Sequence, residues 1–182
     1  AFLVLMQFNY LTIALGLSSM LLAFSYPYMK RITYWPQLFL GITFNWGIIM
    51  AWSAVNNNIS IEIIILYISA IFWTLGYDTI YGAQDISDDE IIGLKSTSIK
   101  FKKNINQFVA SMYLISIFLI CYLFRNEIGY NFFTFLLGLF VSTLIIQVFL
   151  FDKNKKESCL KMFKTNNLAG LILFSSILTL NN

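Results

Sequence analysis

Long apolar runs alternate with short polar stretches along nearly the whole chain. Residues 1–8 are apolar and resemble the end of a helix. Runs near 17 residues approach the length that crosses a bilayer as a helix, and an open sheet cannot span lipid. We therefore predict an all-α membrane protein, a transmembrane helix bundle with about six full spans and the tail of another. The predicted spans are 11–26 (ending at Pro27), 38–55, 61–76, 108–124, 132–151 and 168–180.

Composition supports a membrane protein and excludes several functional classes. The chain is 58% apolar and 12% charged, with a mean hydropathy of +0.72, which excludes an ordinary soluble domain. It contains no histidine, which removes Ser-His-Asp and Cys-His catalysis and haem ligation by histidine. The two cysteines, Cys121 and Cys159, are predicted to be single thiols. No basic patch interleaved with aromatics suggests nucleic acid as a partner, and no linker divides the chain, so we expect one domain over 1–182.

The basic residues are unevenly distributed among the loops. Eleven of the twelve lie in three alternate loops, and only Arg125 lies opposite. Cytoplasmic loops are enriched in Lys and Arg, so these three loops are predicted to be cytoplasmic. The eleven residues are Lys30, Arg31, Lys95, Lys100, Lys102, Lys103, Lys153, Lys155, Lys156, Lys161 and Lys164.

The polar stretch 77–98 lies on the same predicted side and carries five of the nine acidic residues. On a helix turning by about 100° per residue, Asp78, Asp85 and Asp89 fall within about 20° of one line. Aligned carboxylates repel one another unless a cation lies between them. Mg²⁺ prefers oxygen ligands, with one or two carboxylates per ion. The spacing therefore predicts an Mg²⁺ site formed by these three aspartates.

Other residues of the stretch refine this hypothesis. Gly82 lies on the same predicted face and adds no side chain, whereas Asp88 and Glu90 point elsewhere. Lys95 follows the predicted helix end at Gly93 and is a candidate to meet the far end of an anionic ligand. Two alternatives remain open: a solvated acidic loop between helices, and a cation-binding transporter or channel.

A second candidate group lies at residues 26–31. Tyr26 and Lys30 are four apart and share a face if the helix continues past Pro27. Lys30 or Arg31 could bind an anion, Arg31 in a bidentate manner. The alternative is an aromatic belt with basic membrane anchors.

Polar residues inside the spans are predicted to serve packing. Asn45 and Trp46 lie beside small residues in an apolar run, a pattern typical of helix–helix contacts. Asn166 and Asn167 receive the same interpretation.

Three stretches resemble the UbiA family of membrane prenyltransferases, and the likeness extends over essentially the whole chain. They are YPYMKRITYWPQLFLGITFNWG at 26–47, YDTIYGAQDISDDEIIGLKST at 77–97 and CLKMFKTNNLAGLILF at 159–174. The resemblance implies a nine-helix bundle around a cavity open to lipid. It also implies transfer of a polyprenyl group from its diphosphate to the ring of 4-hydroxybenzoate, in ubiquinone synthesis, with Mg²⁺ as cofactor. The implied location is a bacterial inner membrane, or alternatively the mitochondrial inner membrane.

The resemblance also assigns roles by position. Asp85 and Asp89 match the second aspartate motif, with Asp78 at the upstream aspartate, so all three are implied metal ligands, and Asp85 and Asp89 are also implied to be catalytic. The resemblance implies residues that contact the diphosphate and residues that contact the aromatic acceptor. Arg31 is implied to bind the carboxylate of the acceptor and to be catalytic. The implied substrate-binding residues are Tyr26, Lys30, Arg31, Tyr81 and Lys95.

One feature of the family pattern is absent from these residues. The first aspartate motif, of the form NDxxDxxxD, would lie in an N-terminal third that we expect to be missing, so residues 1–182 are expected to form one prenyltransferase domain without that third. The chain alone is therefore expected to be inactive, with a separately encoded N-terminal half as one conceivable partner. An inactive remnant of such an enzyme is the remaining alternative.

Overall fold

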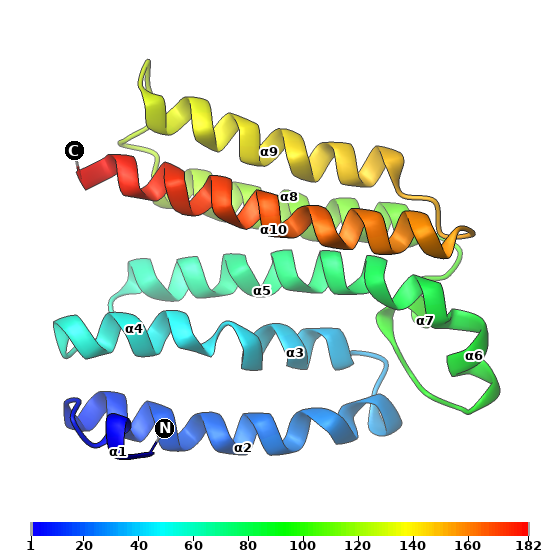
Figure 1. Cartoon of the computed structure of the whole chain (residues 1–182), viewed down its shortest axis with the longest axis horizontal. Helices are drawn as coiled ribbons and strands as arrows, with labels where there is room; N and C mark the ends of the chain where they lie inside the picture. Colours follow the sequence, from blue (N-terminus) through cyan, green and yellow to red (C-terminus); the bar gives the residue numbers. More distant parts are fainter. Residues whose placement is uncertain (1, 182) are drawn as a thin grey trace.

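The computed structural model describes residues 2–181, and within them every regular element is helical (Figure 1). The helices run side by side along one direction, with α5 in the middle against α3, α8 and α10. The predicted all-α architecture is confirmed. The elements are α1 Phe2–Leu5, α2 Tyr10–Ile32, α3 Pro36–Phe44, α4 Trp46–Asn56, α5 Ile61–Gly82, the 3₁₀ turn η1 Ala83–Asp85, α6 Ile86–Ile91, α7 Thr97–Lys100, α8 Ile105–Leu123, α9 Phe132–Leu150, α10 Lys156–Leu178 and the 3₁₀ turn η2 Thr179–Asn181.

Five passes are long and apolar enough to cross a membrane, where about six were predicted. They are α2, α3 with α4, the segment Ile61–Ile91, α8 and α9. The sixth, α10, lies alongside α9 but begins twelve residues before the predicted start at 168. Its first half is amphipathic, since Cys159, Met162 and Asn166 are buried at helical spacing while lysines face outward. A search for apolar runs misses such a segment.

The predicted helix end at Pro27 is wrong. Helix α2 continues to Ile32, and the Thr33 N–H caps it on the Met29 carbonyl oxygen at 2.9 Å. Proline removes one hydrogen bond and crowds the preceding turn, but helices packed in a bundle tolerate it. Because the helix continues, Tyr26 and Lys30 lie one turn apart on one face, as the second candidate group requires.

The predicted single span 38–55 is divided at Asn45 into α3 and α4. The Asn45 side chain donates to the Gly41 carbonyl oxygen at 2.9 Å and to the Thr74 hydroxyl of α5 at 2.8 Å. The helices approach closely, since a Cβ added at Gly41 would lie 3.1 Å from the Ile71 carbonyl oxygen. Trp46 donates to the Leu15 carbonyl oxygen at 3.0 Å. Both residues therefore join helices, as predicted.

A buried polar network joins four helices at the centre of the bundle. The Tyr113 hydroxyl of α8 donates to the Gln147 amide oxygen of α9 at 2.6 Å, and Gln147 exchanges hydrogen bonds with Asn166 of α10. The Trp73 indole of α5 donates to Asn166 at 2.9 Å. This confirms the packing role predicted for Asn166, whereas Asn167 is exposed.

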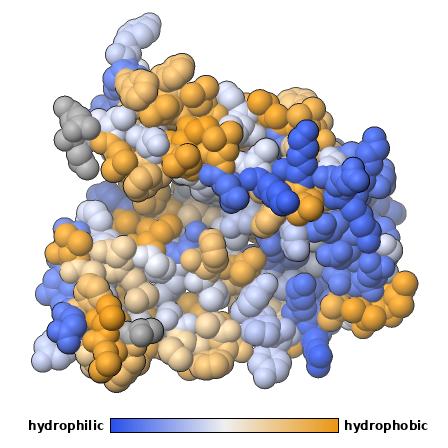
Figure 2. Space-filling view, viewed as in Figure 1, coloured by the Kyte–Doolittle hydropathy of each residue, from blue (hydrophilic) through white to orange (hydrophobic). Residues whose placement is uncertain are grey.

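Charged side chains gather at one end of the bundle. Figure 2 shows hydrophilic residues concentrated on the side where Figure 1 places α6, α7 and the α9–α10 loop. The three basic loops thus share one end, which we call the basic end, as their alternation predicted. Its assignment to the cytoplasmic side stays a prediction.

Candidate functional site

The acidic stretch does not form the continuous helix on which the one-face prediction rested. Helix α5 ends at Gly82, a 3₁₀ turn follows, and α6 starts at Ile86. The cause is visible in the burial of Ile80, Ala83 and Ile86, which are spaced by three. A 3₁₀ helix has three residues per turn, so tightening the chain keeps all three against the core.

As a result, three different elements carry the predicted metal ligands. Asp78 lies in α5, Asp85 ends the turn and Asp89 lies in α6. Within residues 2–181, no group of three or more His, Cys, Asp or Glu side chains is close enough to hold a metal ion by itself. The predicted three-aspartate cluster is therefore not preassembled, because the turn rotates the later aspartates away from the first.

The acidic residues nevertheless fall into two groups. Asp88 pairs with Lys156 of α10 at 3.3 Å, and Glu90 pairs with Lys102 at 2.7 Å. Both residues thus have basic partners, while the prediction that they point away from the site stays a prediction. In the part of the chain that the structure describes, Asp78, Asp85 and Asp89 form no ion pair. Their carboxylates remain free for a cation.

Helix α2 presents part of the second candidate group to these carboxylates. The charge of Lys30 interacts with both Asp78 and Asp89, and Tyr26 lies within electrostatic range of Asp78. Lys30 is exposed at the basic end. Arg31 is also exposed but, among residues 2–181, makes no ion pair with any acid. Lys30 too forms no ion pair among these residues, so its relation to Asp78 and Asp89, like that of Tyr26 to Asp78, is electrostatic and not a direct contact.

Lys95 lies against the end of α2. Its backbone N–H donates to the Lys30 carbonyl oxygen at 2.8 Å, and its ammonium donates to the Ile32 carbonyl oxygen at 3.1 Å. The ammonium also lies 5.7 Å from the centre of the Tyr34 ring. Lys95 therefore holds the α2 end that carries Lys30, and two of its three ammonium hydrogens remain for a ligand. Its predicted contact with an anion stays a prediction.

A buried set of polar residues behind the site was missed from sequence. The Gln37 side-chain oxygen of α3 accepts from the Thr97 N–H at 3.0 Å, and the Thr79 and Thr97 hydroxyls lie 2.7 Å apart. The Ser98 hydroxyl donates to the Thr79 carbonyl oxygen at 2.8 Å. All four residues are buried. The only sequence signal was the run of three hydroxyl residues at 96–98. Such a run is typical of an exposed loop, but here its side chains are buried and form hydrogen bonds inside the bundle.

Aromatic rings border the site on the α10 side. Tyr81, which is 40% exposed, lies with its ring centre 4.7 Å from that of Phe163. Tyr77 contacts the same Phe163 ring at 5.8 Å. The predicted substrate residue Tyr81 thus forms an aromatic wall that extends from the charged group toward the apolar interior.

Within residues 2–181, the structure gathers free carboxylates, a lysine from a facing helix and an aromatic wall at one end of an apolar helix bundle, the arrangement of a candidate site in a membrane protein. The chain belongs to the UbiA prenyltransferase family, whose sequence profile matches residues 1–173.

Individual relatives agree with this assignment. The chain is 41% identical over 175 residues to "4-hydroxybenzoate polyprenyltransferase, mitochondrial" of Bos taurus, covering 96% of this chain and 47% of the relative. It is 40% identical over 176 residues to the protein of the same name from Arabidopsis thaliana, covering 96% and 43%. The chain thus spans about half the length of the curated relatives it matches.

The fold agrees as well. The structure matches the apo structure of a UbiA homolog from Aeropyrum pernix K1 with a TM-score of 0.80 at 22% identity, covering 98% of this chain and 67% of that one. At this identity, the match supports the fold alone.

Proposed function

We propose that this chain is part of an enzyme that transfers a polyprenyl group from polyprenyl diphosphate to the ring of 4-hydroxybenzoate, in ubiquinone synthesis. One observation carries the proposal most directly: among residues 2–181, Asp78 and Asp89 are free of ion pairs and lie within electrostatic range of Lys30 of another helix. About 40% identity to relatives named for this reaction supports the choice of donor and acceptor.

The donor set suits Mg²⁺ together with a diphosphate. Mg²⁺ commonly takes only one or two protein carboxylates and completes its shell with phosphate oxygens and water, so a preassembled cluster is not needed. Asp78, Asp85 and Asp89 would hold the metal, which would neutralise charge on the diphosphate. Lys30 and Lys95 would bind the outer phosphate oxygens as point charges.

In the proposed reaction, the allylic C–O bond of the donor breaks and both bonding electrons leave with the diphosphate. Lys30, Lys95 and the Tyr26 hydroxyl stabilise the charge that develops there. The allylic carbon bonds to the ring carbon beside the phenol hydroxyl, and the ring proton passes to a carboxylate, water or the released diphosphate. Arg31 binds the acceptor carboxylate in a bidentate manner, which requires this exposed side chain to turn toward the site.

The surroundings suit the apolar part of the donor. Tyr81 and Phe163 lead from the charged group into the bundle, so a prenyl chain can extend along them while its diphosphate stays at the basic end. Membrane lipid would supply the donor directly. The names of the relatives favour a mitochondrial membrane over a bacterial inner membrane for this protein.

The opposing aspartate motif would come from the part of the relatives' length that these residues do not span, either in one chain or as a separate half. A cation transporter fits less well, because Asp78, Asp85 and Asp89 lie toward the basic end, and the acids at the opposite end, Glu62 and Glu127, are separated from them by the apolar passes.

Activity of the complete protein tests the proposal. Membranes containing it should convert radiolabelled 4-hydroxybenzoate and a polyprenyl diphosphate into a lipid-extractable product with Mg²⁺, and should form none with EDTA. Activity with another aromatic acid but not with 4-hydroxybenzoate would refute the proposed acceptor. Mg²⁺-independent product would refute the metal site.

A further inference from the structure

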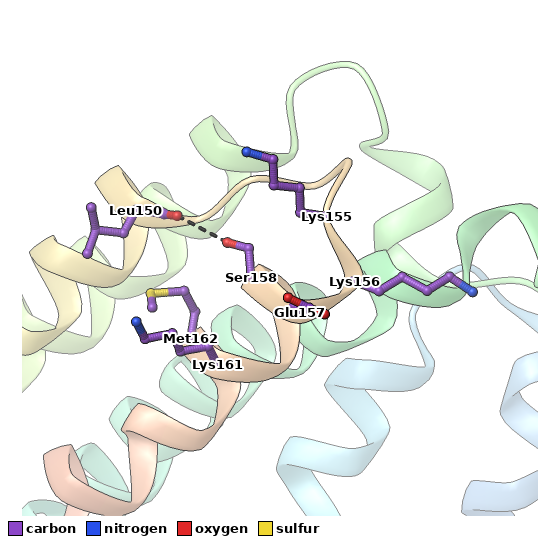
Figure 3. Close-up of a pocket in the computed structure, with 7 residues that line it drawn as sticks. All are labelled: Leu150, Lys155, Lys156, Glu157, Ser158, Lys161 and Met162. Carbon is purple, nitrogen blue, oxygen red and sulfur yellow. Dashed lines mark hydrogen bonds between the residues drawn. The ribbon is translucent and has the colours of Figure 1, made fainter.

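A recess with basic residues opens between the end of α9 and the start of α10, apart from the aspartates (Figure 3). Its volume is about 580 Å³. Figure 3 shows Lys155 and Lys161 on two sides of it, while Lys156 extends away toward its partner Asp88. Leu150 and Met162 contribute apolar atoms to its lining. Its lining is Leu150, Lys155, Lys156, Glu157, Ser158, Lys161 and Met162.

A second recess lies on the other side of Lys161. It has a volume of about 570 Å³ and is lined by Glu157, Leu160, Lys161, Lys164, Thr165 and Leu168. Lys161 therefore stands between two cavities of nearly equal size. Within residues 2–181, Lys161 and Lys164 have no acidic partner within ion-pair distance. Glu157 lines both recesses, and two of the lining lysines are paired with acids from outside the lining, Lys155 with Asp152 at 3.6 Å and Lys156 with Asp88 at 3.3 Å.

The surface becomes apolar along α10, away from the basic end. Leu160, Leu168 and Leu171 are 37%, 54% and 61% exposed. Leu168 lies seven residues beyond Lys161, or about 10 Å deeper at about 1.5 Å per residue. Cationic groups at the membrane border with apolar grooves below them match an amphiphile that has an anionic head and hydrocarbon chains.

We propose that this surface binds one anionic phospholipid. Lys161, with Lys164 beside it, holds the headgroup phosphate, and the acyl chains extend from there along the second recess and the exposed Leu168 and Leu171 of α10. Because Lys155 and Lys156 are already paired, the remaining charges at the recesses are those of Lys161 and Lys164 against Glu157, which is still net positive and favours an anionic over a zwitterionic headgroup. The apolar lining distinguishes a lipid from free phosphate.

The test compares two single-charge variants of the complete protein. Lys161→Gln removes the central ammonium, and Lys103→Gln removes an exposed lysine at the same end outside both recesses. Native mass spectrometry would count lipids retained from mixed phosphatidylglycerol and phosphatidylcholine micelles. We expect the unmodified protein to prefer phosphatidylglycerol. Lys161→Gln should weaken retention about fivefold and Lys103→Gln by less than about twofold.

A second arm separates headgroup from chains. Leu168→Asn, which keeps every charge, should also reduce phosphatidylglycerol retention, and inorganic phosphate at millimolar concentration should fail to displace the lipid. Equal losses in the two lysine variants would show general surface attraction and overturn the site. Displacement by inorganic phosphate would indicate an ion site. No preference for phosphatidylglycerol in the complete protein would also overturn the proposal.

Discussion

Replacing Gln37 tests whether the buried polar residues behind the site hold it in place. Gln37→Leu has nearly the same size but removes the oxygen that accepts from the Thr97 N–H at 3.0 Å. Thr97 is fully buried, so its N–H finds no water. A buried donor without a partner costs about 1–3 kcal/mol. For a domain of about 150–250 residues, each kcal/mol lowers the melting temperature by about 2–4 °C.

The same substitution should affect substrate binding. Thr97 follows Lys95 by two residues, and the Lys95 N–H donates to the Lys30 carbonyl oxygen. Loosening this loop frees both lysines, so the KM for the polyprenyl diphosphate should rise more than kcat falls.

The assays are thermal inactivation of the detergent-solubilised complete protein and steady-state kinetics with varied diphosphate. Gln107→Leu is the matched control, since Gln107 is exposed. Equal melting temperatures for Gln37→Leu and Gln107→Leu would refute the reasoning. A stability loss with unchanged KM would show that the loop does not position the lysines.

Three further predictions follow from the arrangement of the helices. Cysteine accessibility should place Asn57 and Lys161 on opposite sides of the membrane, and labelling from one side would contradict the bundle topology. Asn166→Leu should destabilise the complete protein by about 1–2 kcal/mol, because the polar network loses its α10 member. Asn167→Leu, at an exposed position, should be nearly neutral. Equal unfolding midpoints for the two variants would show that the network does not stabilise the protein. Residues 1–182 alone should insert into membranes without forming prenylated product, and robust Mg²⁺-dependent product from them would show that one aspartate motif suffices.

The apolar runs and the distribution of charge predicted the architecture because a membrane restricts both. A span must be a long apolar helix, and basic residues gather in the loops on one side. The apolar runs located the passes, and the alternation of basic loops located the end at which they gather. Prediction failed where tertiary packing overrides local rules. Helix α2 passes through Pro27 within the bundle. Helix α10 begins at Lys156, before the predicted start, and the prediction missed its first half because that half is amphipathic and contains no continuous apolar run.

The candidate site shows the same division. Sequence spacing grouped Asp78, Asp85 and Asp89, which the structure leaves without ion pairs among residues 2–181, yet it placed them on one continuous helix. The 3₁₀ turn forms because Ile80, Ala83 and Ile86 all face the core. That burial depends on the helices that pack against them, which the local sequence does not reveal. The hydrogen bond from the Thr97 N–H to Gln37 joins residues 60 positions apart, so no local sequence pattern predicts it.

The central claim is that the unpaired aspartates bind the metal and diphosphate while the paired ones do not. Asp89→Asn and Asp88→Asn in the complete protein change adjacent residues by the same chemistry, and Asp88 is tied to Lys156. The measurement is the Mg²⁺-dependent prenylation rate at saturating 4-hydroxybenzoate, normalised to the amount of membrane-inserted protein. We expect Asp89→Asn to lower it at least about a hundredfold, the loss of a few kcal/mol of transition-state stabilisation, and Asp88→Asn to lower it by less than about threefold. Similar, small effects of the two substitutions would contradict the account and support a solvated acidic loop.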